Sequence, residues 1–494
     1  MKTQIITSAF PFVPAEINIA HLSSTYLPAD VYTRYQKLFG NRCCHISATD
    51  VHSIYASKDG LKIDKKLCEY FHEKYKNIFD IFKINFDCYQ KTDVDFHLEN
   101  VKKTLELLYA NNTIYRKYAT VLKCADCNKY LPKRFAIAED VTEKIGTIDI
   151  AIIPKHKKRK CYYCSSKNII CDERPHWFLK IEKYKNKISQ NISNFIQDEV
   201  RKQTISFLKN DLQDWNISRD NTIGLPFPFD QSNCSLYLWF ESLVGYDSIA
   251  TFAGINNGKY VHFIGKNIIY YHTVILPVIL TEGLNCEQLN YQISARGFMD
   301  FSKSDKIFLD FDSIVNLYNV DYLRFYLVYK INDNICDFYF TEDEFKEIIN
   351  KILCNKIGNL LYRIWFLLNE HKDKKRVLDK KNNMVISILK VFIPRIKKKL
   401  NNIMVFSILY EILDIVKLFN DSLGNKDIRN IEKPENRGLI AFYAYTILYL
   451  LYPIIPGLVE KSNFFCNMDI FSFFNIDKII NLPINTKFTK WEKI

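Results

Sequence analysis

The chain has 494 residues, of which 48% are hydrophobic and 25% charged, and its formal net charge is +13. This length exceeds what one hydrophobic core supports, so we expect two to four domains, and the composition excludes a largely disordered chain. The positive net charge fits either a polyanionic partner or an ordinary solvated surface. The 14 cysteines are mostly scattered singly, which favours reduced thiols in a cytoplasmic protein.

The N-terminal part alternates between strand and helix patterns. Residues 4–12 predict a strand, residues 21–39 a helix that stops at Gly40, and residues 43–50 a second strand ending at Asp50. Two further helical patterns cover residues 65–79 and 97–112. This order predicts an α/β fold with a parallel sheet and crossover helices. In such folds ligands bind where a strand runs into a helix, which here is residues 7–21.

Four cysteines stand in a region of short strands and turns that begins near Tyr115. They form two CxxC pairs separated by 33 residues. Each pair can present two thiolates to one metal ion, and Zn²⁺ takes four such ligands in a closed, structural site. The alternative is paired core thiols or a redox-active CxxC. The predicted ligands of one structural Zn²⁺ are Cys124, Cys127, Cys161 and Cys164.

Strand patterns resume at residues 236–240 and 261–264, so the cysteine-containing region is expected to be an insertion. From Asp321 to Ser462 the apolar residues follow a helical period, which predicts a helical bundle.

Residues 439–459 could span a bilayer, which takes about 20 residues. They contain two prolines and four tyrosines, so we expect a buried bundle helix and no membrane contact. At the N-terminus we expect no signal peptide.

Residues 7–21 read TSAFPFVPAEINIAH and resemble the first signature of class I aminoacyl-tRNA synthetases, in the TSALPYxNGxxHLGH form of the methionyl-tRNA synthetase family. Five more blocks resemble those of the family in the same order, so the resemblance covers essentially the whole chain. They are DWNISRD (214–220), LYLWFESLVGY (236–246), FIGKNIIYYHTVILP (263–277), DYLRFYL (321–327) and NKIGNLLYR (355–363).

The resemblance implies a Rossmann-like catalytic domain, an inserted connective subdomain with a zinc knuckle, and an anticodon-binding-like helical bundle. The expected boundaries are 1–112 and 211–320 for the two halves of the catalytic domain, 113–210 for the insertion and 321–494 for the bundle. The implied reaction uses ATP with Mg²⁺ to activate methionine as methionyl adenylate, followed by transfer to an initiator or elongator methionine tRNA. A cytoplasmic monomer is expected, because no C-terminal tRNA-binding appendage is evident.

The phosphate-binding residues follow from the two family signatures. His21 matches the last histidine of HLGH and would donate to the α-phosphate, with Asn18 in place of the first histidine and Ala20 in place of the glycine. The KMSKS signature corresponds to residues 300–304, with Asp300 for the first lysine and Phe301 for the methionine. The residues that would hold the departing pyrophosphate are Ser302, Lys303 and Ser304.

The resemblance also implies an amino-acid pocket. Asp50 matches the carboxylate that pairs with the α-ammonium group, and the aromatic walls suit a thioether. The alternative is that these aromatics are ordinary core residues. Phe12, Leu243 and Ile275 replace a Tyr, a Pro and a Phe of the family. The pocket positions are Ala9, Phe10, Phe12, Trp239, Tyr246 and His272.

In the helical part, Asn359 and Arg363 match the anticodon-reading residues, whereas Glu435 replaces the stacking tryptophan. Because unpaired bases are read by stacking, this replacement weakens the case for tRNA. Together with Asn18 and Asp300 it leaves two other functions open. One is a tRNA-independent amino-acid-activating ligase of secondary metabolism, and the other is a non-catalytic RNA-binding paralogue.

Overall fold

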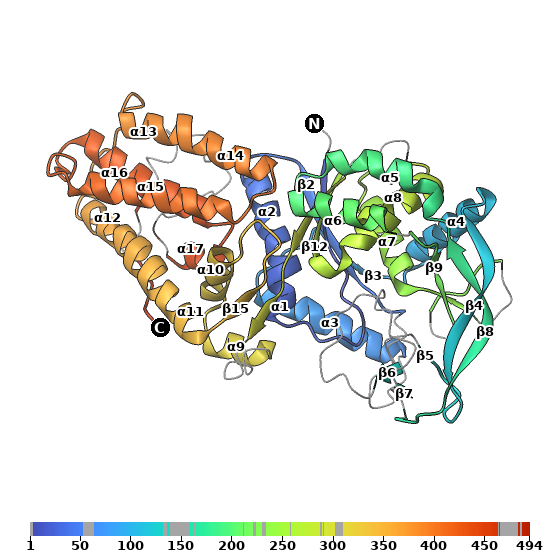
Figure 1. Ribbon diagram of the computed structural model, residues 1–494. Coiled ribbons are helices and arrows are strands. Elements are labelled where there is room, and N and C mark those ends of the chain that lie inside the picture. The colour runs from blue at the N-terminus through green and yellow to red at the C-terminus, as the bar shows by residue number, and fades with distance from the viewer. Residues whose placement is uncertain are drawn as a thin grey trace.

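The computed structural model shows an elongated molecule with a central sheet, a helical end that contains α12 to α17, and a long hairpin at the opposite end (Figure 1). The residues that the structure describes are 3–52, 64–131, 136–138, 159–161, 164–210, 212–220, 224–229, 234–256, 258–286, 289, 291–301, 310–462, 464, 483–484 and 487–494.

The central sheet has five parallel strands in the order β13-β12-β1-β2-β3. Apart from their first one or two residues, its middle strands β12, β1 and β2 are buried on both faces, as expected for a parallel sheet covered by helices. The strand order reverses between β1 and β12, so the carboxyl ends of these two strands flank the ligand crevice typical of such folds. The strands are β1 (Gln4–Ser8), β2 (Cys43–Thr49), β3 (Cys88–Lys91), β12 (Lys259–Gly265) and β13 (Tyr291–Arg296).

Helices cover both faces of this sheet and form two separate cores. On one face α2 and α3 share a core with the helical end, and on the other face α4, α7 and α8 pack together. The first crossover is one continuous helix with a π-helical turn, made of α1 (Ile19–His21), η1 (Leu22–Tyr26) and α2 (Leu27–Leu38). The others are α3 (Lys65–Ile81), α4 (Asp95–Ala110), α7 (Leu238–Phe252), η5 (Lys266–Ile268), η6 (Tyr271–Ile275), α8 (Leu276–Val278) and η7 (Ile279–Gly283).

The cysteine-containing region is built on a long antiparallel hairpin. Strand β4 (Ile114–Cys124) pairs with β8 (Ile169–Leu179) along its whole length, within a four-stranded sheet of order β5-β4-β8-β9. The region also contains β5 (Tyr130–Leu131), β6 (Ala136–Ala138), β7 (Arg159–Cys161), η3 (Glu182–Tyr184), α5 (Lys185–Asn191), η4 (Ile192–Asn194) and α6 (Asp198–Lys209). The return to the central sheet passes through β9 (Trp215–Asn216), β10 (Ser218–Arg219) and β11 (Ser235–Leu236).

The C-terminal part is mainly helical, as predicted. Helix α16 (Pro434–Leu451) is buried on every side from Arg437 onward, so the long apolar stretch is a central bundle helix. Within the described part of the chain, no helix is both long and apolar enough to cross a membrane. The other helices are α9 (Phe311–Leu317), α10 (Val320–Lys330), α11 (Glu342–Ile348), η9 (Ile349–Gly358), α12 (Asn359–Asn369), α13 (Asn383–Ser387), η10 (Ile388–Phe392), α14 (Ile393–Asn401), α15 (Ser407–Gly424) and α17 (Pro456–Lys461).

One short strand interrupts the helical pattern. Strand β15 (Phe338–Phe340) pairs in parallel with β14 (Met299–Phe301), which follows the last strand of the central sheet. Its side chains alternate, since Tyr339 is exposed and Phe340 is buried against Phe301. The pairing ties the start of the helical part to the edge of the crevice.

A buried ion-pair network joins the helical part to the sheet domain. Arg324 of α10 is fully buried, and its guanidinium contacts Asp30 of α2 at 2.7 Å and the carbonyl of Ile454 at 2.8 Å. Arg34 contacts the same carboxylate at 2.8 Å. Burial alone would raise the pKa of Asp30, but Arg34 and Arg324 hold it below its usual value. The carboxylate is therefore charged and compensated, and it fixes the helical part against α2.

Candidate active site

The crossover after β1 places Asn18 and His21 at the start of the first helix. The side-chain oxygen of Asn18 accepts hydrogen bonds from the backbone N–H groups of Ala20 (3.1 Å) and His21 (3.2 Å). In return, Nδ1 of His21 accepts from the backbone N–H of Asn18 at 3.2 Å. This reciprocal arrangement is a capping box, which satisfies N–H groups that a helix start leaves unpaired.

The capping box also determines which ring nitrogen of His21 carries the proton. Because Nδ1 accepts a hydrogen bond, a neutral His21 bears its proton on Nε2. The side chain is solvent-accessible, but the surrounding protein partly desolvates the ring and lowers its pKa. The neutral ring can thus donate from Nε2 to an anion, next to the positive end of the helix.

Asp50 lies at the end of β2, beside the chain that leaves β1. Its backbone N–H donates to the carbonyl of Pro11 (2.8 Å), and its own carbonyl accepts from Val13 (2.9 Å). One carboxyl oxygen, Oδ2, contacts the hydroxyl of Ser242 on α7. The other, Oδ1, is buried and has no hydrogen-bond partner among the described residues. Burial, and to a lesser degree the charge of Glu241, raises the pKa of Asp50 well above its usual value.

Aromatic side chains gather on the α7 side of this carboxyl group. Phe10 and Tyr246 meet edge to face at 4.9 Å, and the Tyr246 hydroxyl lies 3.1 Å from Nε2 of His272. His272 donates from Nδ1 to the carbonyl of Ile268, so its Nε2 accepts from Tyr246, and burial lowers its pKa to about 4. A Cβ at Gly245 would lie 2.6 Å from the Phe10 ring, so glycine is needed for this close approach.

The remaining predicted pocket residues fall into two groups. Ala9 and Phe12 both belong to the segment that leaves β1. Phe12 forms a β-bridge with Asp50, and the carbonyl of Ala9 accepts from the Tyr26 hydroxyl at 3.0 Å. Trp239 packs edge to face on Tyr271 at 4.5 Å. By contrast, the substituted positions Leu243 and Ile275 are buried core residues of the α7 face.

Of the residues that match the KMSKS signature, the structure describes Asp300 and Phe301. Asp300 is exposed on β14, where its carboxylate accepts from the backbone N–H of Phe301. Ser302, Lys303 and Ser304 lie outside the described residues.

The four cysteines of the insertion converge at one point. Their sulfur atoms all lie within 4.8 Å of one another, with Cys124 and Cys164 at 3.5 Å and Cys127 and Cys161 at 3.7 Å. A tetrahedral zinc with Zn–S bonds of about 2.3 Å separates its sulfur ligands by about 3.8 Å. The cluster could therefore hold a metal ion.

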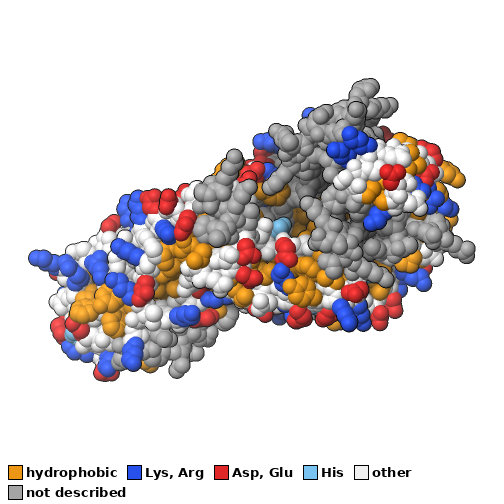
Figure 2. All heavy atoms as spheres, turned by 90° about the horizontal axis from the view of Figure 1, so that it is seen from below, with side chains coloured by type: hydrophobic (Ala, Val, Ile, Leu, Met, Phe, Trp, Pro, Cys, Tyr) orange, Lys and Arg blue, Asp and Glu red, His pale blue; other side chains and the backbone are white. Residues whose placement is uncertain are grey.

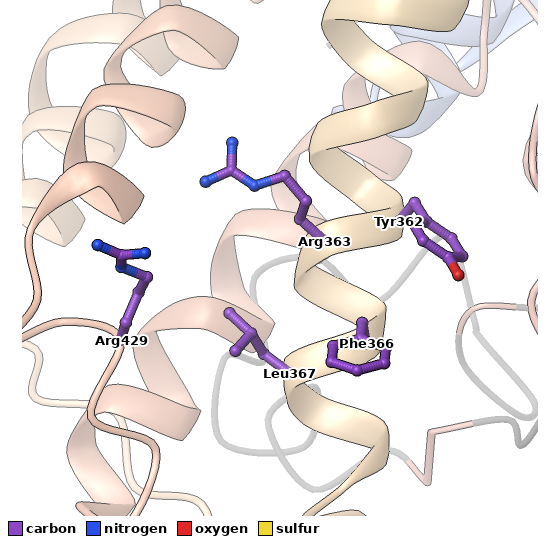
Figure 3. Close-up of a pocket in the computed structure, with 5 residues that line it drawn as sticks. All are labelled: Tyr362, Arg363, Phe366, Leu367 and Arg429. Carbon is purple, nitrogen blue, oxygen red and sulfur yellow. The ribbon is translucent and has the colours of Figure 1, made fainter.

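A surface hollow of about 380 Å³ lies beside α12 in the helical part. Arg363 and Arg429 come from different elements and reach toward the same space, and Arg363 also donates to Asn420 at 2.9 Å (Figure 3). Phe366 is 51% exposed, which makes its ring available for stacking, whereas the ring of Tyr362 already packs against Trp365 and Phe488. Asn359 is half-buried at the start of α12, and Glu435 is exposed in the first turn of α16. The lining residues are Tyr362, Arg363, Phe366, Leu367 and Arg429.

Comparison with known families agrees with this geometry. The family model of the class I (M) tRNA synthetases matches residues 4–365, which include the crevice, the insertion and the start of α12. The chain belongs to this family. The synthetase is 28% identical to the methionine–tRNA ligase of Methanococcus aeolicus over 92% of its own length and 74% of the relative. It is 27% identical to that of Methanocaldococcus jannaschii over 93% and 76% of the two chains.

Solved structures show the same fold. Methionyl-tRNA synthetase of Mycobacterium tuberculosis bound by methionyl-adenylate superposes with a TM-score of 0.79, over 99% of both chains and at 17% identity. The free form of that protein gives a TM-score of 0.77. The similarity extends through the helical part of the synthetase, beyond the residues that the family model matches.

Several residues of the synthetase site were missed by sequence reasoning. Ser242 contacts Asp50, and Glu241 accepts from His52 at 2.7 Å. Both stand in α7, whose start overlaps residues 236–240; the strand predicted there is wrong, because only Ser235–Leu236 is a strand and the helix begins at Leu238. The isolated polar pair in this apolar run was a usable signal, because a buried polar side chain needs a partner. Phe366 and Arg429 at the hollow carried no comparable signal, since single exposed residues of these types are common.

Proposed function

We propose that this synthetase joins methionine to ATP to form methionyl adenylate and pyrophosphate, and then transfers the methionyl group to the 3′ end of a tRNA. The observation that carries the proposal is Oδ1 of Asp50, which is buried and has no hydrogen-bond partner among the described residues, next to the rings of Phe10 and Tyr246. A buried carboxyl oxygen of this kind is costly unless a ligand pairs with it. The names of the archaeal relatives and of the solved structures support methionine as that ligand.

In the proposed complex the α-ammonium group of methionine binds Asp50, and the thioether packs against Phe10, Trp239 and Tyr246. Sulfur packs favourably against aromatic edges, and the neutral His272 holds the Tyr246 hydroxyl away from the apolar space. The pocket therefore recognises the charge common to all amino acids at one end and a polarisable apolar side chain at the other.

ATP, bound as its magnesium salt, is the second substrate. The methionine carboxylate attacks the α-phosphorus, and pyrophosphate leaves. His21 donates from Nε2 to the α-phosphate, and the Asn18 amide adds a second N–H donor from its Nδ2. Lys303, with Ser302 and Ser304, neutralises the pyrophosphate. Catalysis of this kind depends on charge stabilisation in fixed positions more than on covalent chemistry of the protein.

Transfer then requires tRNA. The ribose hydroxyl at the tRNA 3′ end attacks the adenylate carbonyl, and AMP leaves. We place part of the anticodon contact at the hollow beside α12, where Arg363 and Arg429 can meet phosphates or bases and Phe366 can support a stacked base. Lys and Arg side chains also gather at this end of the molecule, interspersed with acidic ones (Figure 2). Asn359 completes the predicted contact set.

The cysteine cluster is proposed to hold one structural Zn²⁺. All four ligands are thiols, so no coordination position stays open for a reacting water. The ion would hold β7 against the tip of the long hairpin, because Cys124 ends β4 and Cys161 ends β7. Its role is therefore to shape the insertion.

The test is amino-acid-dependent exchange of pyrophosphate into ATP, measured with each of the twenty amino acids, followed by charging of methionine tRNA. We expect exchange with methionine and charging of the tRNA. Exchange without charging of any tRNA would instead indicate the tRNA-independent ligase, and no exchange at all would indicate the non-catalytic paralogue.

Two variants assign these steps to their residues. Lys303→Ala should lose most exchange, and Lys306→Ala is its matched control three residues away. Phe366→Ala should weaken charging by about ten- to a hundredfold while leaving exchange intact, because stacking contributes about 1–3 kcal/mol per base. Tyr410→Ala is the control here, since Tyr410 is similarly exposed, at 53%, and does not line the hollow.

A further inference from the structure

The hydroxyl of Ser242 has two possible acceptors. It lies 2.5 Å from Oδ2 of Asp50 and 3.0 Å from the backbone carbonyl of Leu238, one turn earlier on α7. A hydroxyl group has a single hydrogen, so it cannot donate to both oxygens at once. The Leu238 carbonyl can only accept. The direction of the Ser242–Asp50 hydrogen bond must therefore depend on whether the carboxyl group carries a proton.

Both protonation states fit the same heavy-atom positions. When Asp50 is ionised, its oxygens only accept, and Ser242 donates to Oδ2. When Asp50 is neutral, its O–H donates to Ser242, and the Ser242 hydroxyl turns to the Leu238 carbonyl. In each case the short contact is satisfied, and the buried Oδ1 has no hydrogen-bond partner among the described residues.

The surroundings favour the neutral form while the pocket is empty. The charged group nearest to Asp50 on α7 is Glu241, which has the same sign. Burial is the main cause that raises the pKa of the Asp50 carboxyl group, because Glu241 is itself paired with His52 at 2.7 Å and lies 3.6 Å from His97. Among the described residues, the other titratable groups linked to Asp50 are tyrosine hydroxyls, which supply no positive charge. These hydroxyls belong to Tyr26 of η1, Tyr75 of α3, Tyr89 of β3 and Tyr246 of α7.

We propose that Ser242 is a positioning residue that allows Asp50 to exchange its proton for the α-ammonium group of an amino acid. On binding, the ammonium takes Oδ1, the Asp50 proton leaves to solvent, and the Ser242 hydroxyl turns from Leu238 to Oδ2. One proton is released for each amino acid bound. The inference rests on the proposed function, because it takes the ligand of Asp50 to be an amino acid.

The test is calorimetric titration of the intact protein with methionine, in pairs of buffers that differ in ionisation enthalpy, from pH 6 to 8. We expect release of nearly one proton per methionine at the low end of this range. Linkage then makes the affinity rise by up to about tenfold per pH unit until Asp50 is ionised in the empty protein.

Variants of α7 test the part played by Ser242. Ser242→Ala removes the donor to the ionised carboxylate, so methionine should bind about tenfold more weakly at pH 7, with the pH profile displaced to higher pH. Ser242→Thr keeps the hydroxyl and should restore the wild-type profile. Ser248→Ala is the matched control, because Ser248 makes the same type of bond to the carbonyl of Val244 and does not contact Asp50.

The outcomes separate the inference from the proposed function. Methionine binding without proton release anywhere from pH 6 to 8 would overturn the inference, as would a wild-type pH profile for Ser242→Ala. If another amino acid binds with proton release and methionine does not, the inference holds and the proposed substrate is wrong. If no amino acid binds, both are wrong.

Discussion

Replacing Asp50 by asparagine should weaken methionine binding and stabilise the fold. The side chain keeps its shape, so the neighbouring contacts of Phe12 and Val13 with the backbone are retained. What is lost is the negative charge that the α-ammonium group requires. A hydrogen bond to a charged group contributes about 1.5–3 kcal/mol, so the KM for methionine in pyrophosphate exchange should rise by about ten- to a hundredfold or more.

The effect of Asp50→Asn on stability should depend on pH. The ordinary pKa of an aspartate side chain is 3.8, and burial raises the pKa of Asp50 well above this value in the folded protein. Above about pH 4 the unfolded chain has released this proton while the folded protein keeps it. The folded state then binds more protons, so the free energy of unfolding decreases as pH rises, until the folded pKa is passed. Asparagine has no such dependence.

Thermal unfolding at several pH values measures this difference. Asp50→Asn and wild type should unfold at the same temperature near pH 4. At pH 8 the variant should be more stable than the wild type, because only the wild type keeps a proton in the folded state that its unfolded chain has released. Asp247→Asn is the control, because burial also raises the pKa of Asp247 but its partner is Tyr260. A variant with wild-type methionine KM, or one less stable than wild type at pH 8, would refute the reasoning.

Three other substitutions test separate parts of the molecule. His21→Asn should lower pyrophosphate exchange by about 10²–10³ with an unchanged methionine KM in steady-state assays, because one preorganised donor to the phosphate is lost. Cys164→Ser should reduce metal content, measured by mass spectrometry, from about one zinc per chain to almost none. Arg324→Met should lower the free energy of unfolding in denaturant titrations, because it leaves the buried Asp30 carboxylate with Arg34 as its one cationic partner among the described residues. Adding Asp30→Asn should recover part of that loss.

Local patterns predicted much of the fold. The strand and helix alternation of residues 4–112 predicted the parallel sheet, and the apolar stretch of α16 was correctly predicted as a bundle helix. The first helix begins at Ile19, two residues before the predicted start, because Asn18 provides the cap. Pairings such as β9 beside β8 and β15 beside β14 were not predictable. Two- and three-residue strands have no periodicity of their own, and only tertiary contacts select their partners.

For the candidate site, the family resemblance identified side chains that the fold brings into contact, such as Phe10, Tyr246 and His272. It did not identify Ser242, because the hydrogen bond to Asp50 joins residues 192 positions apart. The domain boundaries and the roles of the matched residues remain predictions. The same is true of the phosphate contacts of Ser302, Lys303 and Ser304.

The departures from the HLGH signature are compatible with adenylate formation once their local roles are considered. Asn18 uses its oxygen to cap the helix, which leaves the two hydrogens of Nδ2 without a partner among the described residues. The asparagine thus keeps an N–H donor at the position of the first histidine of the signature, where the proposed reaction needs a donor to the phosphate. Ala20 is half-buried, and its carbonyl accepts from Ser23 and Ser24. Because these bonds involve its backbone alone, the added methyl group disturbs neither the cap nor the tautomer of His21. The donor that matters most to the proposed chemistry is therefore preserved.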